Sequence, residues 1–234
     1  MSLMTVHGVK VPLRPDDVSP VIWQALDNET YEAKEAKWIS KAVKPGDRVL
    51  ELGSGIGIIT SLIAQIPDVQ VWAFEANPAS VALAKRVVEA NDLDNVVLLK
   101  GILAAGPPRP FTFYLRKDLW MSSMDKDQGP YEREMIIVST DADDFIVQHG
   151  TNVLVMDIEG AERELLQHAK LPGIERVYLE LHDHLYGLDG IRDITQALAL
   201  KGYAYDPRGS RGPCVLFGKD DGPREYEEVE PDAA

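Results

Sequence analysis

The sequence predicts an α/β fold in which a mostly parallel, seven-stranded sheet carries helices on both faces. Short apolar runs alternate with segments of helical periodicity through most of the chain, which is the pattern of a parallel sheet with crossover helices. A glycine-rich turn joins the first apolar run to a helical segment. The length of 234 residues and the hydrophobic content of 45% suit one large domain.

Seven apolar runs are the expected strands: 48–53, 69–75, 96–102, 153–158, 175–181, 203–206 and 214–218. Helices fit between them at 57–66, 78–91, 160–168 and 190–201. Pro78 after Asn77 suits the first turn of a helix, and Gly202 suits a helix end.

The pattern also predicts how the chain is divided. Residues 1–47 contain the helix-like stretch YEAKEAKWISKAV, so we expect a helical segment packed on a core domain at 48–219. The alternation breaks near 103–150, where FTFYLR is expected to form one arm of an inserted hairpin. Residues 220–234 lack apolar periodicity and predict an acidic, mobile tail.

Composition excludes several classes of partner. The formal net charge is −14, with 38 acidic against 24 basic residues, which argues against nucleic acid because phosphate binding needs a basic surface. Cys214 is the single cysteine, so an internal disulfide and a cysteine-cluster metal site are excluded. Without a long apolar run or a charged-then-apolar leader, we expect a cytoplasmic protein with no membrane partner. No pattern specifies an oligomeric state.

The turn ELGSGIG, residues 51–57, follows the first expected strand directly. Its glycines, Gly53, Gly55 and Gly57, lie where a backbone must approach something too large to share space with side chains. A dinucleotide prefers G-x-G-x-x-G, but Ile58 occupies the position of the third glycine. The spacing, preceded by Glu51, instead resembles the first motif of S-adenosylmethionine-dependent methyltransferases of the Rossmann-like class.

Two carboxylates suit that cofactor. Glu75 ends the second expected strand, where it can accept hydrogen bonds from both ribose hydroxyls of an adenosine, or alternatively cap the next helix. Glu51 can favour the positively charged end of S-adenosylmethionine, which carries an ammonium and a sulfonium. The alternative for Glu51 is a buried acid that only braces the loop.

A second motif narrows the resemblance. NVLVMDIEGAERELL, residues 152–166, is similar to the signature of the FkbM family of methyltransferases, in which D-x-E-G-x-E leads from a strand into a helix. YEAKEAKWI, FEANP, the pair Ser122-Ser123 and YLELH are further matches, so the resemblance covers about residues 30–206. The family's first motif usually reads D-x-G-A-N-x-G, and ELGSGIG departs from it. The resemblance implies a Rossmann-like methyltransferase fold, commonly with activity on hydroxyl oxygens.

The resemblance also implies S-adenosyl-L-methionine as the cofactor. Its expected binding residues lie at the glycine turn and at the ends of the second, third and fourth strands: Glu51, Gly53, Ser54, Gly55, Gly57, Glu75, Ala76, Gly101, Ile102 and Asp157.

Four titratable residues are the catalytic candidates, because ligands bind beyond the carboxyl ends of parallel strands. The fourth strand brings Asp157 and Glu159 to this edge, and the fifth brings Glu180 and His182. Strand alternation puts the two residues of each pair on the same side if the extended form persists. Asp157 is expected to position the substrate or contact the cofactor amine, with a helix cap as the alternative. His182 is expected to be the general base, because its reference pKa lies near working pH, with an ordinary strand-end histidine as the alternative.

A metal ion and a lid are further possibilities. Magnesium prefers oxygen ligands, which Asp157, Glu159 and Glu180 can supply, but the H-x-H spacing at His182 is common by chance, so we expect no metal. Tyr31, Glu32 and Glu35 fall on a helix that can close over the cofactor, and residues 120–124 can cover the substrate. Burial of the large aromatic side chains explains Tyr31 and Trp120 equally well.

We therefore expect a methyltransferase that methylates a small molecule, at a hydroxyl oxygen, by in-line transfer. Nitrogen acceptors stay open, although DIEG replaces the Asn-Pro-Pro-aromatic motif of many amine and adenine methylators. The alternatives are a cofactor-binding module without turnover that acts through a partner, and a nicotinamide oxidoreductase, against which Ile58 argues.

Overall fold

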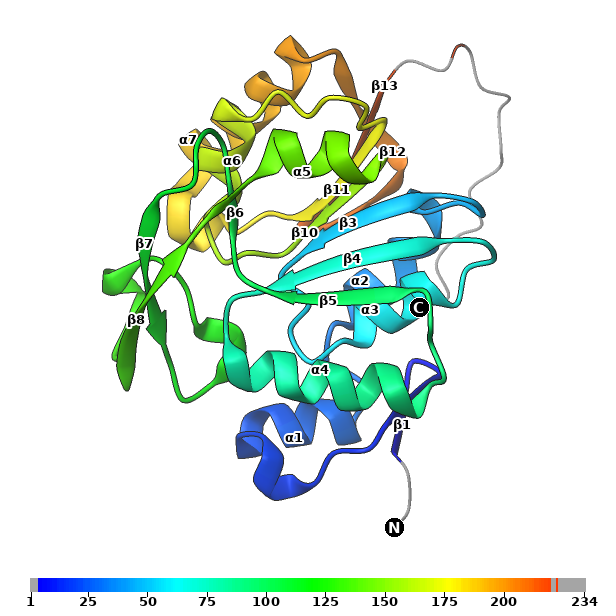
Figure 1. Cartoon of the computed structure of the whole chain (residues 1–234), viewed down its shortest axis with the longest axis vertical. Helices are drawn as coiled ribbons and strands as arrows, with labels where there is room; N and C mark the ends of the chain where they lie inside the picture. The colour runs from blue at the N-terminus through cyan, green and yellow to red at the C-terminus, as the bar shows by residue number, and fades with distance from the viewer. Residues whose placement is uncertain (1–3, 220–221, 223–234) are drawn as a thin grey trace.

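The computed structural model describes residues 4–219 and Gly222, and it shows a central sheet between two layers of helices (Figure 1). The strand order in this seven-stranded sheet is β12-β13-β11-β10-β3-β4-β5. Neighbours from β11 to β5 are parallel, whereas β13 is antiparallel to both β11 and β12. The predicted α/β fold with a mostly parallel, seven-stranded sheet is confirmed.

The strands coincide with the seven apolar runs. They are β3 (Arg48–Leu52), β4 (Gln70–Glu75), β5 (Val96–Lys100), β10 (Val153–Met156), β11 (Arg176–Glu180), β12 (Tyr203–Arg211) and β13 (Cys214–Lys219). The four helices expected between them are α3 (Ile58–Ala64), α4 (Pro78–Ala90), α6 (Glu162–His168) and α7 (Asp183–Leu200). α7 begins earlier than predicted, because Gly187 interrupts its helical geometry with a φ of 61° and hides the first turns from the apolar periodicity.

One helix of the core, α5 (Ala142–His149), escapes the sequence prediction. Asp141 precedes it and accepts the backbone N–H groups of Asp143 and Asp144, and Gly150 follows it with a left-handed φ of 59°. These are ordinary start and stop signals, but the helix is short and lies inside the irregular stretch near 103–150.

The N-terminal segment contains more than the expected helix. α2 (Ala33–Ala42) lies within YEAKEAKWISKAV, but a hairpin of β1 (Met4–Val6) and β2 (Val9–Val11) and the helix α1 (Pro20–Asp27) precede it. Ser19 caps α1 by accepting the Ile22 N–H. The apolar side chains of this segment pack against α3 and α4 in one buried cluster, which includes Val6, Ile22, Leu26, Ile58 and Leu83.

The insert between β5 and α5 forms one wall of the site described below. β6 (Leu103–Ala104) pairs with β9 (Thr140–Asp141), and β7 (Pro110–Leu115), which contains all of FTFYLR except Arg116, pairs antiparallel with β8 (Arg133–Val138). The buried Arg116 organises the loop between β7 and β8 by donating hydrogen bonds to the carbonyl oxygens of Met121 (3.0 Å) and Asp125 (2.6 Å). One guanidinium therefore fixes the shape of this loop.

Both faces of the sheet are covered. α5, α6 and α7 pack on one face, around Leu50, Trp72, Phe145, Leu165 and Ile194. α2 and α3 pack on the other, around Ile39, Val49, Ile59, Val71 and Tyr178. This two-sided burial explains why the strands read as continuous apolar runs.

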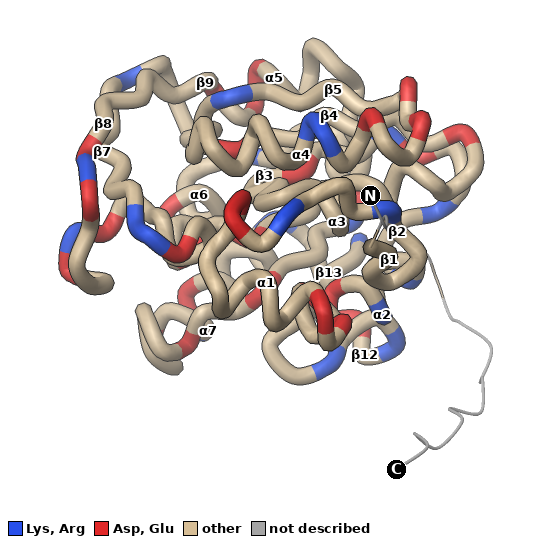
Figure 2. The backbone as a smooth tube through the Cα atoms, turned by 90° about the horizontal axis from the view of Figure 1, so that it is seen from below, with Lys and Arg blue, Asp and Glu red and all other residues tan. Residues whose placement is uncertain are grey.

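Charge is spread over the outside of the molecule. In the view of Figure 2, lysines and arginines are distributed over several elements, with acidic residues between them. No helix among the described residues is long and apolar enough to cross a membrane. The expected acidic tail at 220–234 lies outside the described residues, except for Gly222.

The strand register aligns the C-terminal ends of β4, β3, β10 and β11. Leu52 lies beside Phe74 on one side and Met156 on the other, and Met156 lies beside Leu179. The residues that follow each strand therefore emerge at the same edge of the sheet, which we call the carboxyl edge.

Candidate functional site

The carboxyl edge opens into a cavity of about 870 Å³, its open mouth included. Most of the expected cofactor residues line this first cavity: Gly53, Gly55, Glu75, Ala76, Gly101, Ile102 and Asp157. Glu159 lines it as well. Tyr31 and Glu32 from the N-terminal segment, and Phe113, Trp120, Ser122 and Met124 from the insert, complete the wall. Both segments considered as lids thus reach the cavity.

A second, smaller cavity of about 350 Å³ adjoins the first, and Glu32, Leu52, Gly53 and Asp157 line both. Its remaining polar wall consists of Glu35, Glu51, Tyr178 and Glu180. Glu51 and Tyr178 are each 2% exposed, and both Glu51 Oε2 and the Tyr178 hydroxyl have no hydrogen-bond partner.

The three glycines of the turn do different work. Gly53 has a φ of +87°, and a Cβ there would lie 1.8 Å from the backbone oxygen of Asp157, so only glycine lets these two loops meet. A Cβ at Gly57 would lie 3.1 Å from the Ala84 Cα, so this glycine permits close packing of α3 on α4. Gly57 and the buried Ser54 do not line either cavity, so of the three turn glycines only Gly53 and Gly55 line the first cavity.

Glu75 faces the first cavity and also ties the glycine turn to β4. One of its oxygens accepts the Gly55 N–H (2.9 Å) and the other the Asn77 N–H (2.7 Å). The α4 cap is the Asn77 side chain, which accepts the Ala79 N–H, so Glu75 is not the cap of that helix. Each carboxylate oxygen keeps a second acceptor position for a ligand hydroxyl. Burial raises the pKa of Glu75 to about 7.

The structure brings the four catalytic candidates together around one imidazole nitrogen. His182 Nε2 lies 3.3 Å from Asp157 Oδ1, 3.9 Å from Glu159 Oε2 and 3.9 Å from Glu180 Oε2. The sequence suggested that strand alternation would bring these groups together, but in the structure Asp157, Glu159 and His182 converge from loops that follow the strands. β10 ends at Met156 and Glu159 has a left-handed φ of 52°, while His182 precedes the first residue of α7.

Glu162 holds the other side of the His182 ring. It is fully buried, accepts the backbone N–H groups of Ile158 (2.9 Å) and Gly160 (3.0 Å), and places Oε1 3.2 Å from His182 Nδ1. Glu162 is not among the site residues expected from the sequence. Its position in D-x-E-G-A-E marks it as part of the motif, but its contact with His182 joins residues too distant in the chain to be read from spacing.

The reference pKa on which the prediction of His182 as general base rests does not apply at this position. Burial lowers the pKa of His182, but contacts with Asp157 and Glu162 outweigh burial and raise it to about 11. Neither contact has the angles of a good hydrogen bond, so we describe them as ion pairs. The imidazole therefore keeps its proton at neutral pH and acts as a cation among carboxylates.

The surrounding carboxyl groups are easily protonated. Burial, followed by the charge of Asp157, raises the pKa of Glu159 and that of Glu180 to about 7. Burial raises the pKa of Glu51 to about 8. The Gln128 amide donates to Glu159 Oε2 at 3.2 Å.

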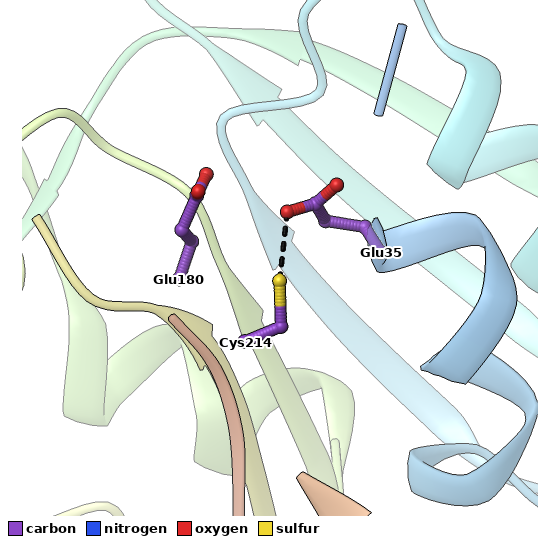
Figure 3. A group of neighbouring side chains, drawn as sticks. All are labelled: Glu35, Glu180 and Cys214. Atoms are coloured by element: carbon purple, nitrogen blue, oxygen red, sulfur yellow. Dashed lines mark hydrogen bonds between the residues drawn. The ribbon is translucent and has the colours of Figure 1, made fainter. Parts of the chain in front are cut away.

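Two groups of side chains among the described residues have donor atoms within 4.8 Å of one another and can hold a metal ion. One consists of Asp157, Glu180 and His182. The other consists of Glu35, Glu180 and Cys214, which come from α2, β11 and β13 and point toward a common space (Figure 3). In that group the Cys214 thiol donates to Glu35 Oε1 at 2.9 Å.

The residues present fit S-adenosylmethionine. Glu51 Oε2 and Asp157 Oδ1 are buried oxygens without a hydrogen-bond partner, which suits the positively charged end of that molecule. Glu75 and the exposed backbone of Gly53 and Gly55 border the adjoining space. A profile described as the methyltransferase FkbM domain matches residues 62–205, which is more than half of the chain. The chain belongs to the FkbM methyltransferase family.

This FkbM methyltransferase is thus an S-adenosylmethionine-dependent methyltransferase with a Rossmann-like fold, and S-adenosyl-L-methionine is its cofactor. Family membership removes the nicotinamide oxidoreductase alternative. The matched region begins at Leu62, after the glycine turn that departs from the family's usual first motif.

Individual relatives are more distant. The ribosomal protein L11 methyltransferase of Acetivibrio thermocellus is 35% identical over 81 residues, which span 34% of this chain and 26% of that protein. The crystal structure of a methyltransferase from Pyrococcus furiosus covers 91% of this chain and 89% of its own, at 16% identity and a TM-score of 0.49. Fibrillarin of Aeropyrum pernix, crystallised with S-adenosyl-L-methionine, covers 76% of this chain and 68% of its own, at 14% identity and a TM-score of 0.46.

Proposed function

We propose that this FkbM methyltransferase methylates a hydroxyl oxygen of a small-molecule acceptor, with Glu159 as the general base. The observation that carries the proposal is the position of Glu159 on the cavity wall beside Asp157, with a pKa of about 7. A base is most effective when its pKa lies near the operating pH. Glu159 takes over the role that the sequence gave to His182.

The cofactor is placed along the carboxyl edge. Glu75 accepts hydrogen bonds from the ribose hydroxyls while its backbone partners keep the glycine turn closed. Gly53 and Gly55 allow close approach of the amino-acid part, and Glu51 and Asp157 favour its ammonium group. When bound, S-adenosylmethionine would supply a methyl group carried on a sulfonium. The acceptor oxygen attacks the methyl carbon in line with the carbon–sulfur bond, and the sulfur leaves as a neutral thioether.

The residues of this chain have two tasks: to accept the proton of the acceptor hydroxyl and to orient the carboxylates beside it. Glu159 accepts the proton of the acceptor hydroxyl as the new carbon–oxygen bond forms. Protonated His182 holds Asp157 on its Nε2 side, and Glu162 fixes the ring from its Nδ1 side. The Gln128 amide, which donates to Glu159 Oε2, sets the direction of the base.

The aromatic side chains Tyr31 and Trp120 cover the first cavity. Their rings stack with centroids 6.0 Å apart and an interplanar angle of 29°. Tyr31 comes from the N-terminal segment and Trp120 from the insert, so two elements close the same space. A cavity of this size, which also has to hold the cofactor, favours a small acceptor. In the view of Figure 2, lysines and arginines are spread out and offer a nucleic acid no basic face.

The decisive variant is Glu159→Gln, which keeps the size and the Gln128 contact but removes the base. Acceptors are first found by screening a library of hydroxyl compounds with labelled S-adenosylmethionine. For any acceptor found, we expect kcat to fall by about 10²–10⁴-fold, the usual contribution of general base catalysis. The dissociation constant of S-adenosylmethionine, measured by calorimetry, should stay unchanged.

Glu164→Gln is the matched control, because Glu164 lies on α6, outside both cavities, and pairs with Arg109 at 2.9 Å. It should behave as the unmodified protein. A fully active Glu159→Gln would remove Glu159 as the base. Failure of the whole library, with the cofactor still bound, would contradict a small hydroxyl acceptor.

A further inference from the structure

The walls of the two cavities are rich in carboxyl groups, which burial makes easy to protonate and which a bound cation would hold in their charged form. Their lining residues include seven carboxylates and no lysine or arginine: Glu32, Glu35, Glu51, Glu75, Asp157, Glu159 and Glu180. Low-dielectric walls of one sign focus the field within a cleft and concentrate ligands of the opposite charge. An anionic acceptor, such as one with a phosphate group, would be repelled from this space.

Protein partners and the cofactor account for only some of these carboxyl groups. His182 supplies one cation, which Asp157 and Glu162 flank most closely. The positively charged end of the cofactor suits Glu51, and backbone N–H groups hold Glu75. Glu35 accepts the Cys214 thiol.

Glu180 has the weakest compensation of the catalytic group. Its nearest cationic atom is His182 Nε2, at 3.9 Å, and its side chain is 26% exposed. The second cavity, which Glu180 lines, also contains the buried Tyr178 hydroxyl, which has no hydrogen-bond partner. Such groups call for a ligand that donates several hydrogen bonds.

An ammonium group has this chemistry. It is a compact cation with three donors, so it can pair with one carboxylate and donate to a neighbouring oxygen or hydroxyl. Glu159 lines the first cavity and Glu180 the second, each lies 3.9 Å from His182 Nε2, and Asp157 lines both cavities. A ligand at this junction therefore meets Glu180 with one end and Glu159 with the other.

We propose that the acceptor is an amine-bearing alcohol whose ammonium group pairs with Glu180 while its hydroxyl faces Glu159. Glu180 is then the specificity-determining residue of the site. This inference rests on the proposed function, because it assumes that Glu159 deprotonates the hydroxyl. It adds the charge of the acceptor, which neither the family nor the fold specifies.

The test compares acceptors in matched triplets that differ at one substituent: an amine, a hydroxyl or a carboxylate next to the hydroxyl to be methylated. Methyl transfer from labelled S-adenosylmethionine should be fastest for the amine member of each productive triplet. Equal or faster transfer to a neutral or anionic member would overturn the inference while leaving the proposed function standing. Absence of transfer to every member would overturn both.

Glu180→Gln should raise KM for the amine acceptor by about 30-fold or more, the low end of what removing one member of a desolvated charge pair costs. KM for the neutral member and the affinity for the cofactor should not change, and Glu164→Gln is again the control. An equal loss for amine and neutral members would reduce Glu180 to a structural residue.

A metal ion is the competing cation for these carboxylates, and the same assay separates it. Turnover should survive a chelator and should not depend on added Mn²⁺ or Mg²⁺. If the chelator abolishes transfer and the metal restores it equally for amine and neutral acceptors, the acidic walls serve the metal and the inference is wrong.

Discussion

The two edges of the central sheet treat buried charge in opposite ways. At the amino edge, the Asp47 carboxylate receives two hydrogen bonds from Arg176 (2.7 and 2.9 Å), one from the Asn152 amide (2.9 Å) and one from the Lys44 N–H (2.6 Å). At the carboxyl edge, Glu51 Oε2 and Asp157 Oδ1 have no hydrogen-bond partner. Both edges belong to the same strands, so the difference is not one of fold.

The contrast distinguishes buried polar residues whose hydrogen bonds stabilise the fold from those that are available to bind a ligand. A buried charge is costly unless it is paired, so a satisfied network such as that of Asp47 serves the folded state. A buried carboxyl group without a partner, such as Glu51, costs free energy in the protein alone, and a cationic ligand recovers it. Mutations at the two edges should therefore differ in sign as well as in size.

The largest effect is expected at the amino edge. Arg176→Met keeps a long side chain but leaves Asp47 without its cation, and the free energy of unfolding should fall by about 3–5 kcal/mol, as when one partner of a buried ion pair is removed. Urea denaturation of the protein without cofactor measures this change. Glu180→Gln, at the other edge of β11, is the control and should not destabilise the protein. Equal losses at both edges would break the comparison.

At the carboxyl edge, Glu51→Gln should stabilise the free protein and weaken the cofactor complex. The amide removes a buried acid whose charged form is poorly solvated. Affinity for S-adenosylmethionine should drop by roughly 10- to 150-fold, which corresponds to about 1.5–3 kcal/mol for a hydrogen bond to a charged group. Calorimetric titration and thermal unfolding report the two effects separately. A destabilised variant with normal affinity would make Glu51 a brace of the loop.

The smallest effect is a dependence of stability on pH. Burial raises the pKa of Glu51 to about 8 and that of Glu75 and Glu180 to about 7 in the folded state, from an ordinary value of 4.5. The folded protein then binds protons that the unfolded chain releases, so this stabilisation is complete below pH 4.5 and is lost as pH rises through 7 to 8. His182, with its pKa raised to about 11, contributes in the same direction above pH 6.5.

Thermal unfolding of the cofactor-free protein should therefore occur at lower temperature at about pH 9 than at about pH 5. Glu51→Gln should flatten this profile, because it removes the carboxyl group with the largest of the three increases. A melting temperature that rises with pH across this range would contradict the assignment of protonated carboxyl groups to the carboxyl edge.

The core of the fold could be predicted because its central strands β3, β4, β10 and β11 are mostly buried and glycine or proline marks most breaks between strand and helix. The start of α7 was missed because Gly187 interrupts its helical geometry, and α5 was missed because the helix is too short to show a clear periodicity. The hairpin of β1 and β2 was missed because three-residue strands offer no alternation to read.

For the site, the sequence indicated which residues gather at the carboxyl edge but not their protonation. Spacing placed Asp157, Glu180 and His182 at neighbouring strand ends. The proton on His182 depends on Glu162, which reaches the ring across a loop and a helix start. The packing role of Gly57 likewise depends on Ala84, which belongs to the next helix. Properties set by contacts between distant segments cannot be read from the pattern of one segment.

Because of the insert between β5 and α5, the acceptor specificity of the protein can change in evolution without a change of fold. Its residues Phe113, Trp120, Ser122 and Met124 reach the cavity, while Arg116 ties its loop together from within. Exchanging this segment would reshape one wall of the first cavity and leave the seven-stranded sheet and the contacts of Glu75 with the glycine turn in place. A different insert could thus give the protein a different acceptor without changing the residues on the opposite side of the cavity.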